Sequence, residues 1–402
     1  MSPADKISSA LHVLTLTPFF PSYQNEVNGC FIAEPIEELK QLGVDSSVIA
    51  VSPIYHPKKQ PSRSALAEWV RYPRIPGNLG LSSAGNLLYA RLLGRIRKMH
   101  DEKPIDVIHA HAALPCGHAA ALVSRRLKIP FVVTIHGLDV FNTCFVDGIP
   151  AAWRRKVSED VYRAAQTAIC ISGKVQEILK TGTPYETRSM IVYNGVNPRL
   201  FSPNPAAVAP ADPEILVVGN LLPSKGQELV LRAVGNRSPS FPQLRCRIIG
   251  EGPDRARLEA LVRELGIGRQ VEFVGRQSRS EVAEAMRSCS VFVLPSRNEG
   301  LGCVYLEAMS CAKPVIACRG QGIDELIEHG KNGWLIPVDG LEPLVQGLSA
   351  LLGSPEMRAQ VGTAARQTIL DKLTLSHQAQ HLATIYRQAS QRSGVQQSPE
   401  FS

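Results

Sequence analysis

The residues with the most evident chemistry lie in one run of the second half, PSRNEGLGCVYLEAM, which begins at Pro295. The apolar stretch Val291–Leu294 predicts a buried strand before this run, and the glycines predict a turn into a helix. Glu299 would then lie in the loop, where a carboxylate accepts hydrogen bonds from hydroxyl groups. The backbone N–H groups of residues 300–304 would form a helix N-terminus, which suits a phosphate. Glu307, two turns later, would look back toward the same place.

A simpler interpretation of this run needs no ligand. Glu299 would cap the helix, and Glu307 would be a solvated side chain. Two acidic residues near a strand end do not by themselves decide between these interpretations. In either case, we expect Glu307 not to belong to a hydrophobic core.

Four histidines cluster in the first half, at positions 109, 111, 118 and 136. His109 and His111 alternate on one predicted strand and would share a face of it. A metal site would need further ligands of suitable type, so we expect no metal site here. We interpret His111 as a polar residue near a strand end. His136 follows the apolar strand Phe131–Ile135 and suits a ligand-binding cleft. The alternative is a turn residue that bonds the backbone.

One stretch of the first half is both amphipathic and basic. Leucines and Ile96 recur at helical spacing between residues 87 and 96, interleaved with four cations, Arg91, Arg95, Arg97 and Lys98. Such a helix could present a basic face to an anionic membrane surface. The alternative is that the apolar stripe packs in the core while the charged face is solvated.

Short apolar runs alternate with amphipathic stretches along the whole chain. Those that predict buried strands are Leu11–Thr17, Ser47–Val51, Val107–Ala110, Phe131–Ile135, Ala168–Ile171, Ile215–Val218, Arg247–Ile249, Val271–Val274, Val291–Leu294 and Val315–Ala317. Helical periodicity appears in Phe31–Leu42 and Pro253–Leu265. This alternation predicts an α/β protein with parallel, doubly wound sheets. The proline-rich stretch Ser202–Pro213 predicts a linker between two Rossmann-like halves.

Composition excludes several classes of protein. The chain has 402 residues, 44% hydrophobic and 20% charged, which is enough for two domains and too apolar for disorder. No stretch predicts a membrane span or a secretory signal, and nine scattered cysteines fit a reducing cytoplasm. The net charge of +8 lies mostly in the first half and indicates an anionic partner. Because aromatic residues are only 6% and the cations are dispersed, nucleic acid is not the expected partner.

Several motifs occur in an order that resembles the retaining glycosyltransferases of family 4. The run from Glu299 to Glu307 is similar to the Glu-x7-Glu signature of that family. The other matching segments are VYNGVN from Val192, VGNLLPSKG from Val218, IGEGP from Ile249, VEFVG from Val271 and CRGQG from Cys318. The resemblance covers nearly the whole chain and implies the GT-B fold, in which two Rossmann-like doubly wound domains face a cleft.

The resemblance also implies a role for individual residues. Lys225 would be the cation that stabilises a leaving diphosphate, and Glu299 would bind hydroxyls of the donor sugar. Glu307 would bind the ribose hydroxyls of the nucleotide. The further donor-binding residues are Gly29, Asn220, Gly250, Arg276, Gly300, Leu301, Gly302 and Cys303. No cofactor or metal is implied, because the nucleoside-diphosphate sugar is a substrate and cations of the protein face its diphosphate.

In the first half, the resemblance implies that His136 contacts the donor sugar or the acceptor. His111 and Asp139 would lie on the acceptor side. The loop at Gly29 resembles the family's glycine loop, which approaches the diphosphate through backbone N–H groups, although only one glycine is present here. The alternative at Gly29 is a simple turn at a helix start.

One departure from the family pattern concerns Asn220, where the family usually has arginine. A lost cation of this kind costs about 2.7–4 kcal/mol of transition-state stabilisation. Arg276 and Arg297 are candidates to replace it. The departure leaves open a catalytically weak or dead sugar-nucleotide-binding subunit. A sugar-nucleotide epimerase shares the fold but lacks the Glu-x7-Glu spacing.

The sequence thus predicts a retaining, metal-independent glycosyltransferase. Its acceptor would be a glycan or lipid-linked, with a role in cell-surface polysaccharide or glycolipid synthesis. Residues 1–204 would form the acceptor domain, 205–374 the donor domain, and 375–402 a crossover helix and tail. We expect a cytoplasmic protein with a candidate peripheral contact to the inner face of the cell membrane.

Overall fold

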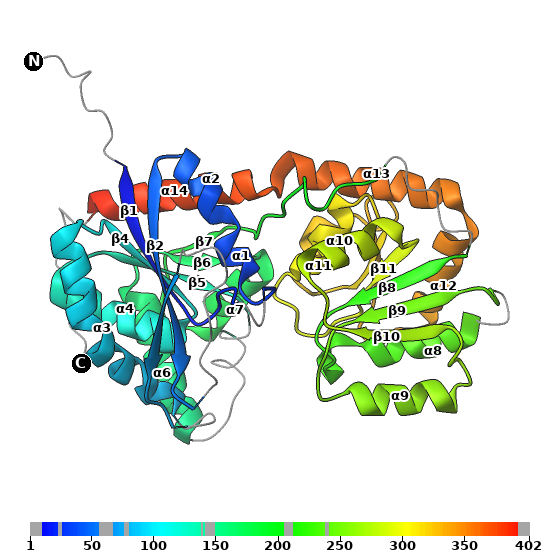
Figure 1. Cartoon of the computed structure of the whole chain (residues 1–402), viewed down its shortest axis with the longest axis horizontal. Coiled ribbons are helices and arrows are strands. Elements are labelled where there is room, and N and C mark those ends of the chain that lie inside the picture. The colour runs from blue at the N-terminus through cyan, green and yellow to red at the C-terminus, as the bar shows by residue number, and fades with distance from the viewer. Residues whose placement is uncertain are drawn as a thin grey trace, which may run out of the picture. The chain divides into compact units, whose positions relative to one another are not determined.

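The computed structural model describes residues 10–22, 26–55, 67–75, 80–137, 140, 149–204, 212–237 and 241–392. The chain divides into two compact units. The first comprises residues 1–193 and 375–402, and the second comprises residues 194–374. Each unit contains one parallel β-sheet with helices packed against it, as the sequence predicts (Figure 1).

The sheet of the first unit has seven strands in the order β3-β2-β1-β4-β5-β6-β7. They are β1 (Leu11–Thr17), β2 (Val44–Pro53), β3 (Ala67–Tyr72), β4 (Val107–His111), β5 (Phe131–Ile135), β6 (Ala168–Cys170) and β7 (Ser189–Ile191). Every neighbouring pair is parallel. The central strands β4 and β5 are buried along their whole length, so the apolar run of β5 fits its place, while β4 buries His109 and His111 among apolar residues.

The first unit's helices are α1 (Cys30–Ala33), α2 (Pro35–Gln41), α3 (Leu81–Glu102), α4 (His118–Leu127), α6 (Ile149–Ala164), α7 (Gly173–Gly182) and α14 (Leu375–Arg392), with a short turn η1 (Ala113–Gly117). The single helix predicted over residues 31–42 is therefore two helices. The second of them begins at Pro35, because proline has no N–H and fits a first helical position.

The sheet of the second unit has six parallel strands in the order β10-β9-β8-β11-β12-β13. They are β8 (Glu214–Val218), β9 (Arg245–Ile249), β10 (Val271–Gly275), β11 (Val291–Val293), β12 (Val315–Cys318) and β13 (Trp334–Ile336). Its helices are α8 (Gln227–Arg237), α9 (Arg255–Glu264), α10 (Arg279–Ser288), α11 (Cys303–Ser310), α12 (Leu341–Gly353) and α13 (Pro355–Lys372). In Figure 1, α8 and α9 lie on one side of strands β8 to β10, and α10 and α11 lie on the other.

The strand orders identify where ligands bind in such sheets. In the first unit, the order reverses between β1 and β4, and in the second between β8 and β11. In open α/β sheets, the crevice beyond the carboxyl ends of the strands at this reversal is the usual binding place. Each unit therefore has one edge at which site residues are expected.

The second unit begins before the predicted boundary at residue 204. The segment from residue 194 to residue 201 packs with the second unit, where Ser310 Oγ donates to the Phe201 carbonyl at 2.6 Å and Arg287 Nη1 donates to the Leu200 carbonyl at 2.9 Å. The Val196 N–H also donates to the Leu373 carbonyl. These hydrogen bonds hold the segment ahead of the proline-rich stretch.

The last helix, α14, belongs to the first unit. Its buried face, which includes Leu382, Ile385 and Tyr386, packs in one hydrophobic cluster with Val13 of β1 and Val107 of β4. The amphipathic helix α3 likewise buries Leu88, Leu92 and Ile96 completely. On its charged face, Arg95 pairs with Glu68, and Lys98 lies 3.7 Å from Glu102.

Candidate active site

Lys225 and Glu299 come together at the carboxyl edge of the second sheet. Lys225 ends the short turn η2 (Pro223–Lys225) that follows β8, and Glu299 lies in the loop between β11 and α11. Lys225 Nζ lies 2.5 Å from Glu299 Oε2, and both side chains are largely shielded from solvent. Two oppositely charged groups therefore meet at the reversal of strand order, where the fold favours a ligand.

The backbone holds this pair in place. The Glu299 N–H donates to Gln321 Oε1 at 2.8 Å, and the Glu299 carbonyl accepts from the Gly322 N–H at 3.1 Å. Beside Lys225, Gly226 has a φ of +73°, and a Cβ there would lie 2.2 Å from the Pro295 carbonyl oxygen. Only glycine lets the loops after β8 and β11 approach this closely.

Glu307 is the second carboxylate of this edge, and the structure corrects one expectation about it. Glu307 is only 3% exposed, so it is buried, whereas one interpretation of the sequence had it solvated. The burial is tolerated because Arg279, the first residue of α10, forms an ion pair with Glu307 Oε1. The sequence analysis did not single out Arg279. The signal in the sequence is the Ser278-x-x-Glu281 capping box, which fixes the start of α10 just beyond β10 and so places Arg279 at this edge.

The loop before α11 supplies backbone groups more than side chains. Leu301 is fully buried, so any contact of this residue with a ligand has to come from its backbone. Gly302 precedes the first residue of α11, Cys303. The Cys303 thiol accepts a hydrogen bond from the Asn194 amide at 3.3 Å, and burial raises its pKa to about 12. The thiol is therefore neutral and does not act as an anion.

Two further predicted residues lie at the ends of neighbouring strands. Gly250 follows β9, and its N–H donates to the Gly275 carbonyl at 2.8 Å, which ties the ends of β9 and β10 together. Arg276 follows β10 and lies 3.3 Å from Glu251. About half of the Arg276 side chain is exposed, so this ion pair is open to solvent.

The carboxyl edge of the first sheet carries three histidines. His111 Nδ1 lies 3.0 Å from His136 Nε2, and the two rings are stacked with centroids 5.2 Å apart. His109 lies behind them, with Nδ1 2.7 Å from the Tyr386 hydroxyl and Nε2 2.6 Å from Thr134 Oγ1. The predicted alternation of His109 and His111 on one face is confirmed by the 4.2 Å separation of their ring centroids.

Burial determines the charge of these histidines. It lowers the pKa of His109 and of His136 to about 3, and that of His111 well below its ordinary value. The imidazoles repel one another's positive charge, which adds to the lowering at His109 and His111. All three rings are therefore neutral at physiological pH. Among the residues that the structure describes, no group of three or more His, Cys, Asp or Glu is placed to hold a metal ion.

Gly29 lies against the segment that follows β1. Its φ is +78°, and a Cβ there would lie 2.5 Å from the Phe19 carbonyl carbon. Phe19 and the nearby Phe31 both contact the His136 ring, with centroids 6.0 and 4.9 Å away. Glycine at this position therefore allows the loop, the two phenylalanines and His136 to pack together. Asp139, predicted on the acceptor side, lies outside the described residues.

Two protein-family models match this chain, one in each half. The Glycosyltransferase Family 4 model matches residues 31–200, and the Glycosyl transferases group 1 model matches residues 201–368. D-inositol 3-phosphate glycosyltransferase from Thermobispora bispora is 31% identical over 340 residues, which are 79% of this chain and 77% of that protein. This chain belongs to glycosyltransferase family 4.

Solved structures agree on the fold of this family 4 glycosyltransferase. Sucrose-phosphate synthase from Thermosynechococcus elongatus matches with a TM-score of 0.76 at 20% identity, covering 94% of this chain and 98% of that one. Anabaena Alr3699/HepE in complex with UDP-glucose matches with a TM-score of 0.73 at 19% identity, covering 94% and 100%. The predicted GT-B fold is confirmed by these likenesses and by the two doubly wound sheets.

At Asn220, this family 4 glycosyltransferase lacks a cation, and neither candidate replacement is unpaired. Arg297 forms two hydrogen bonds with Asp339, and Arg276 pairs with Glu251. The Asn220 side chain is exposed, and its carbonyl accepts from Gln227 Nε2 at 2.9 Å. Lys225 is therefore the cation that lies closest to Glu299 among the contacts of the described residues.

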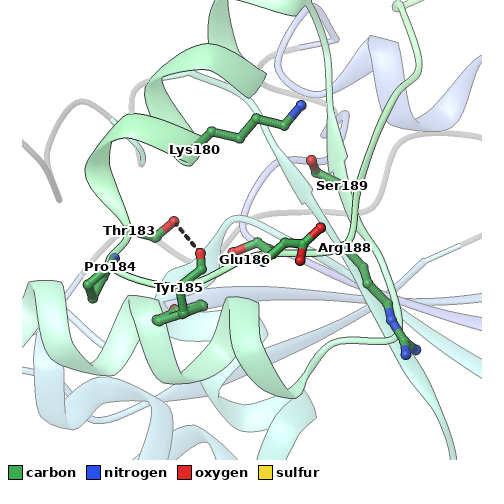
Figure 2. Close-up of a pocket in the computed structure, with 8 residues that line it drawn as sticks. Lys180, Thr183, Pro184, Tyr185, Glu186, Arg188 and Ser189 are labelled. Carbon is green, nitrogen blue, oxygen red and sulfur yellow. Dashed lines mark hydrogen bonds between the residues drawn. The ribbon is translucent and has the colours of Figure 1, made fainter.

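The two described cavities of this family 4 glycosyltransferase lie away from the predicted site residues. Figure 2 shows one of about 650 Å³, with Lys180 on α7 and Ser189 on β7. The segment between them enters the amino end of β7, which is the opposite edge of the sheet from His136. The other, of about 680 Å³, is lined by Arg245 at the amino end of β9 and by Arg269 and Gln270 before β10. Neither cavity contains a residue that the sequence assigned to the site.

Proposed function

We propose that this family 4 glycosyltransferase moves a sugar from a nucleoside-diphosphate sugar to a glycan or lipid-linked acceptor, with retention of the anomeric configuration. The observation that carries the proposal is the Lys225–Glu299 pair at the reversal of strand order in the second sheet. A cation there suits the diphosphate, and a carboxylate beside it suits the hydroxyls of the sugar. The UDP-glucose complex of the Anabaena neighbour supports this class of donor.

The leaving diphosphate gains negative charge as the glycosidic bond breaks. Preorganised cations and N–H groups stabilise such charge without the cost of reorienting water. We assign this role to Lys225 and to the backbone N–H groups at the start of α11, which carries the positive end of its helix dipole. Because these groups meet the charge directly, we propose that the reaction requires no metal.

Glu299 is assigned to binding the donor sugar and not to attack on it. A carboxylate that is ion-paired at 2.5 Å is a weaker nucleophile than a free one, and the pair orients it toward hydroxyl donors. We therefore propose front-face retention, in which the acceptor hydroxyl enters on the side from which the diphosphate leaves. His136, a neutral ring, is assigned to hydrogen bonding with sugar hydroxyls.

For the acceptor, we propose a role in cell-surface polysaccharide or glycolipid synthesis at the cytoplasmic face of the membrane. No helix among the described residues has the length and apolar character to cross a bilayer. Helix α3 buries most of its apolar stripe, but Arg91 and Arg97 on its exposed face form no ion pair with a described residue. These two arginines are the part of the predicted basic face that remains available to an anionic surface.

Vesicle co-sedimentation tests the membrane role. Arg91→Glu with Arg97→Glu should reduce binding to phosphatidylserine vesicles at 0.1 M salt, because each basic residue near an anionic surface contributes about 1 kcal/mol. The effect should shrink at 1 M salt, where the Debye length is only about 3 Å. Arg263→Glu with Arg269→Glu, an equal charge change in the second unit, is the control. Equal sedimentation of all three proteins at low salt would exclude the membrane contact.

Asn220 supports a second candidate, a sugar-nucleotide-binding subunit with little or no activity. The two candidates differ in their chemistry, because a catalytic site releases free sugar slowly from the donor when no acceptor is present. The match to two glycosyltransferase family models disfavours the epimerase alternative.

The proposed function is tested in two steps. A thermal-shift screen across UDP, GDP, ADP and dTDP sugars identifies the donor, because a ligand at one hundred times its Kd stabilises the fold by about 2.7 kcal/mol. Donor hydrolysis without acceptor is then measured, and the anomeric configuration of the product is read by proton NMR. Release of an inverted sugar would contradict retention. Binding with no release of sugar would favour the binding subunit.

A further inference from the structure

Among the described residues, Arg279 and Glu307 form the most buried ion pair at the carboxyl edge of the second sheet. The Glu307 side chain is 4% exposed and the Arg279 side chain 16%. The ion pair uses Glu307 Oε1, while Oε2 accepts no hydrogen bond from the residues that the structure describes. One oxygen of this carboxylate is therefore held by the protein, while the other makes no hydrogen bond within the described part of the chain.

Arg279 is itself held from two sides. Its backbone starts α10, where the Ser278–Glu281 capping box fixes the first turn. Its guanidinium lies over the ring of Phe201, with Cζ 4.8 Å from the centroid, and Phe201 is fully buried. The Phe201 carbonyl in turn accepts from Ser310 Oγ on α11. The side chain of Arg279 thus has little freedom, so it can orient the group to which it is paired.

We propose that Arg279 is a positioning residue for nucleotide recognition. It holds Glu307 by Oε1 so that Oε2 is presented to the vicinal hydroxyls of the nucleotide ribose. This inference rests on the proposed function, because that function assigns Glu307 to the ribose. Arg279 does not touch the reacting atoms and takes no part in breaking the glycosidic bond.

The role of Arg279 has a specific consequence for ligand selection. A charged carboxylate that accepts from ribose hydroxyls distinguishes ribonucleotides from 2′-deoxyribonucleotides. A hydrogen bond to a charged group corresponds to a preference of about tenfold or more. If Arg279 orients Glu307, its loss should remove this preference without removing the contacts of the diphosphate. A purely structural role for Arg279 would weaken both ligands alike and leave their ratio unchanged.

The experiment compares UDP with 2′-deoxy-UDP by calorimetry, or the corresponding GDP or ADP pair if the donor screen selects one of those bases. The wild type should prefer the ribonucleotide about tenfold or more. Arg279→Met should bring the ratio of the two Kd values close to one, and Arg279→Lys should restore part of it. In transfer assays, Arg279→Met should raise the KM for the donor more than it lowers kcat.

Arg287→Met is the matched control. Arg287 lies on the same helix and donates to the Leu200 carbonyl, next to Phe201, but it pairs with Glu284 and not with Glu307. Its loss should leave the ribose preference of the wild type intact. If Arg279→Met keeps the same preference as Arg287→Met, the proposal is wrong.

A double-mutant cycle keeps the proposal testable if Arg279→Met proves unstable. Glu307→Gln retains the shape of the side chain, and Arg279→Lys retains a cation. In the Glu307→Gln background, Arg279→Lys should change the preference no further, because both residues act through one contact. Additive losses would overturn the proposal. If the wild type shows no ribose preference, this proposal is wrong. A separate assay of sugar transfer by the wild type then shows whether the proposed function is wrong as well.

Discussion

The carboxyl edges of the two sheets are built from opposite kinds of chemistry. In the second unit, the side chains are charged and paired, as with Lys225 and Glu299 or Arg279 and Glu307. In the first unit, they are three neutral imidazoles, of which His111 bonds His136, while His109 bonds a threonine and a tyrosine. Yet the two sheets share the same central strand order, so the fold does not explain the difference.

The difference shows how each edge tolerates burial. Lys225 and Glu299 lie 2.5 Å apart, so each offsets part of the other's lost hydration. At the three histidines, burial lowers the pKa and so favours the neutral form. A charged edge suits a ligand that carries or develops charge, whereas a neutral edge suits hydroxyl groups. The predictions below test this division.

The largest effect is expected from the charged edge. Lys225→Met should lower kcat for sugar transfer about 100- to 1,000-fold, which is the effect of removing one group that stabilises charge in a transition state. The melting temperature should be measured alongside, because Glu299 loses its partner. Lys331→Met, which removes an exposed lysine paired with Glu328 at 2.7 Å, should leave kcat unchanged. A fall below threefold for Lys225→Met would mean that the charged pair is structural.

A smaller effect is expected from the neutral edge. His136→Phe keeps an aromatic ring but removes the hydrogen-bonding nitrogens, and one neutral hydrogen bond contributes about 0.5–1.5 kcal/mol. We therefore expect kcat/KM for the complete reaction to fall about tenfold, without a change in nucleotide affinity. A loss as large as that of Lys225→Met would contradict the division between the edges.

The neutral edge also predicts how stability depends on pH. The pKa of His109 is about 3 in the folded protein, whereas an unfolded histidine titrates near 6.5. Between these values the unfolded chain binds a proton that the folded chain does not, so stability falls as pH drops below about 6.5. Well below that pH, each such histidine contributes a slope of about 1.4 kcal/mol per pH unit.

Urea unfolding of His109→Gln at several pH values between about 4.5 and 7.5 measures this slope. The free energy of unfolding of the variant should depend on pH less steeply than that of the wild type, by the slope that one such histidine contributes. His381→Gln, at an exposed position on α14, is the control for a histidine-to-glutamine change outside the buried cluster. Parallel curves for the wild type and His109→Gln would show that His109 is charged in the folded state.

The smallest effect is expected from metal removal. If protein cations stabilise the diphosphate, EDTA should leave the rate of transfer unchanged. The assay compares rates with EDTA, and with EDTA followed by excess Mg²⁺ or Mn²⁺. A loss of activity that either ion restores would transfer the role assigned to Lys225 to a metal.

Most strands could be predicted because they are central and buried on both faces. Their sequences are continuous apolar runs, as in EILVV of β8 and FVVTI of β5. The three strands that the sequence analysis missed, β3, β7 and β13, each lie at the edge of a sheet. β3 and β7 are partly exposed along their length, so their sequences lack a continuous apolar run, and β13 is a run of only three residues.

The sequence by itself determined the class of fold and the family, because glycine spacing and buried runs are local properties, and it singled out Lys225, Glu299 and Glu307 as predicted site residues. Only the tertiary structure decided that Glu307 is buried and that Arg279 holds it. Those two residues lie 28 positions apart, on the neighbouring helices α10 and α11. The charge of the three histidines was also decided there, since a pKa depends on surroundings that distant segments such as α14 complete.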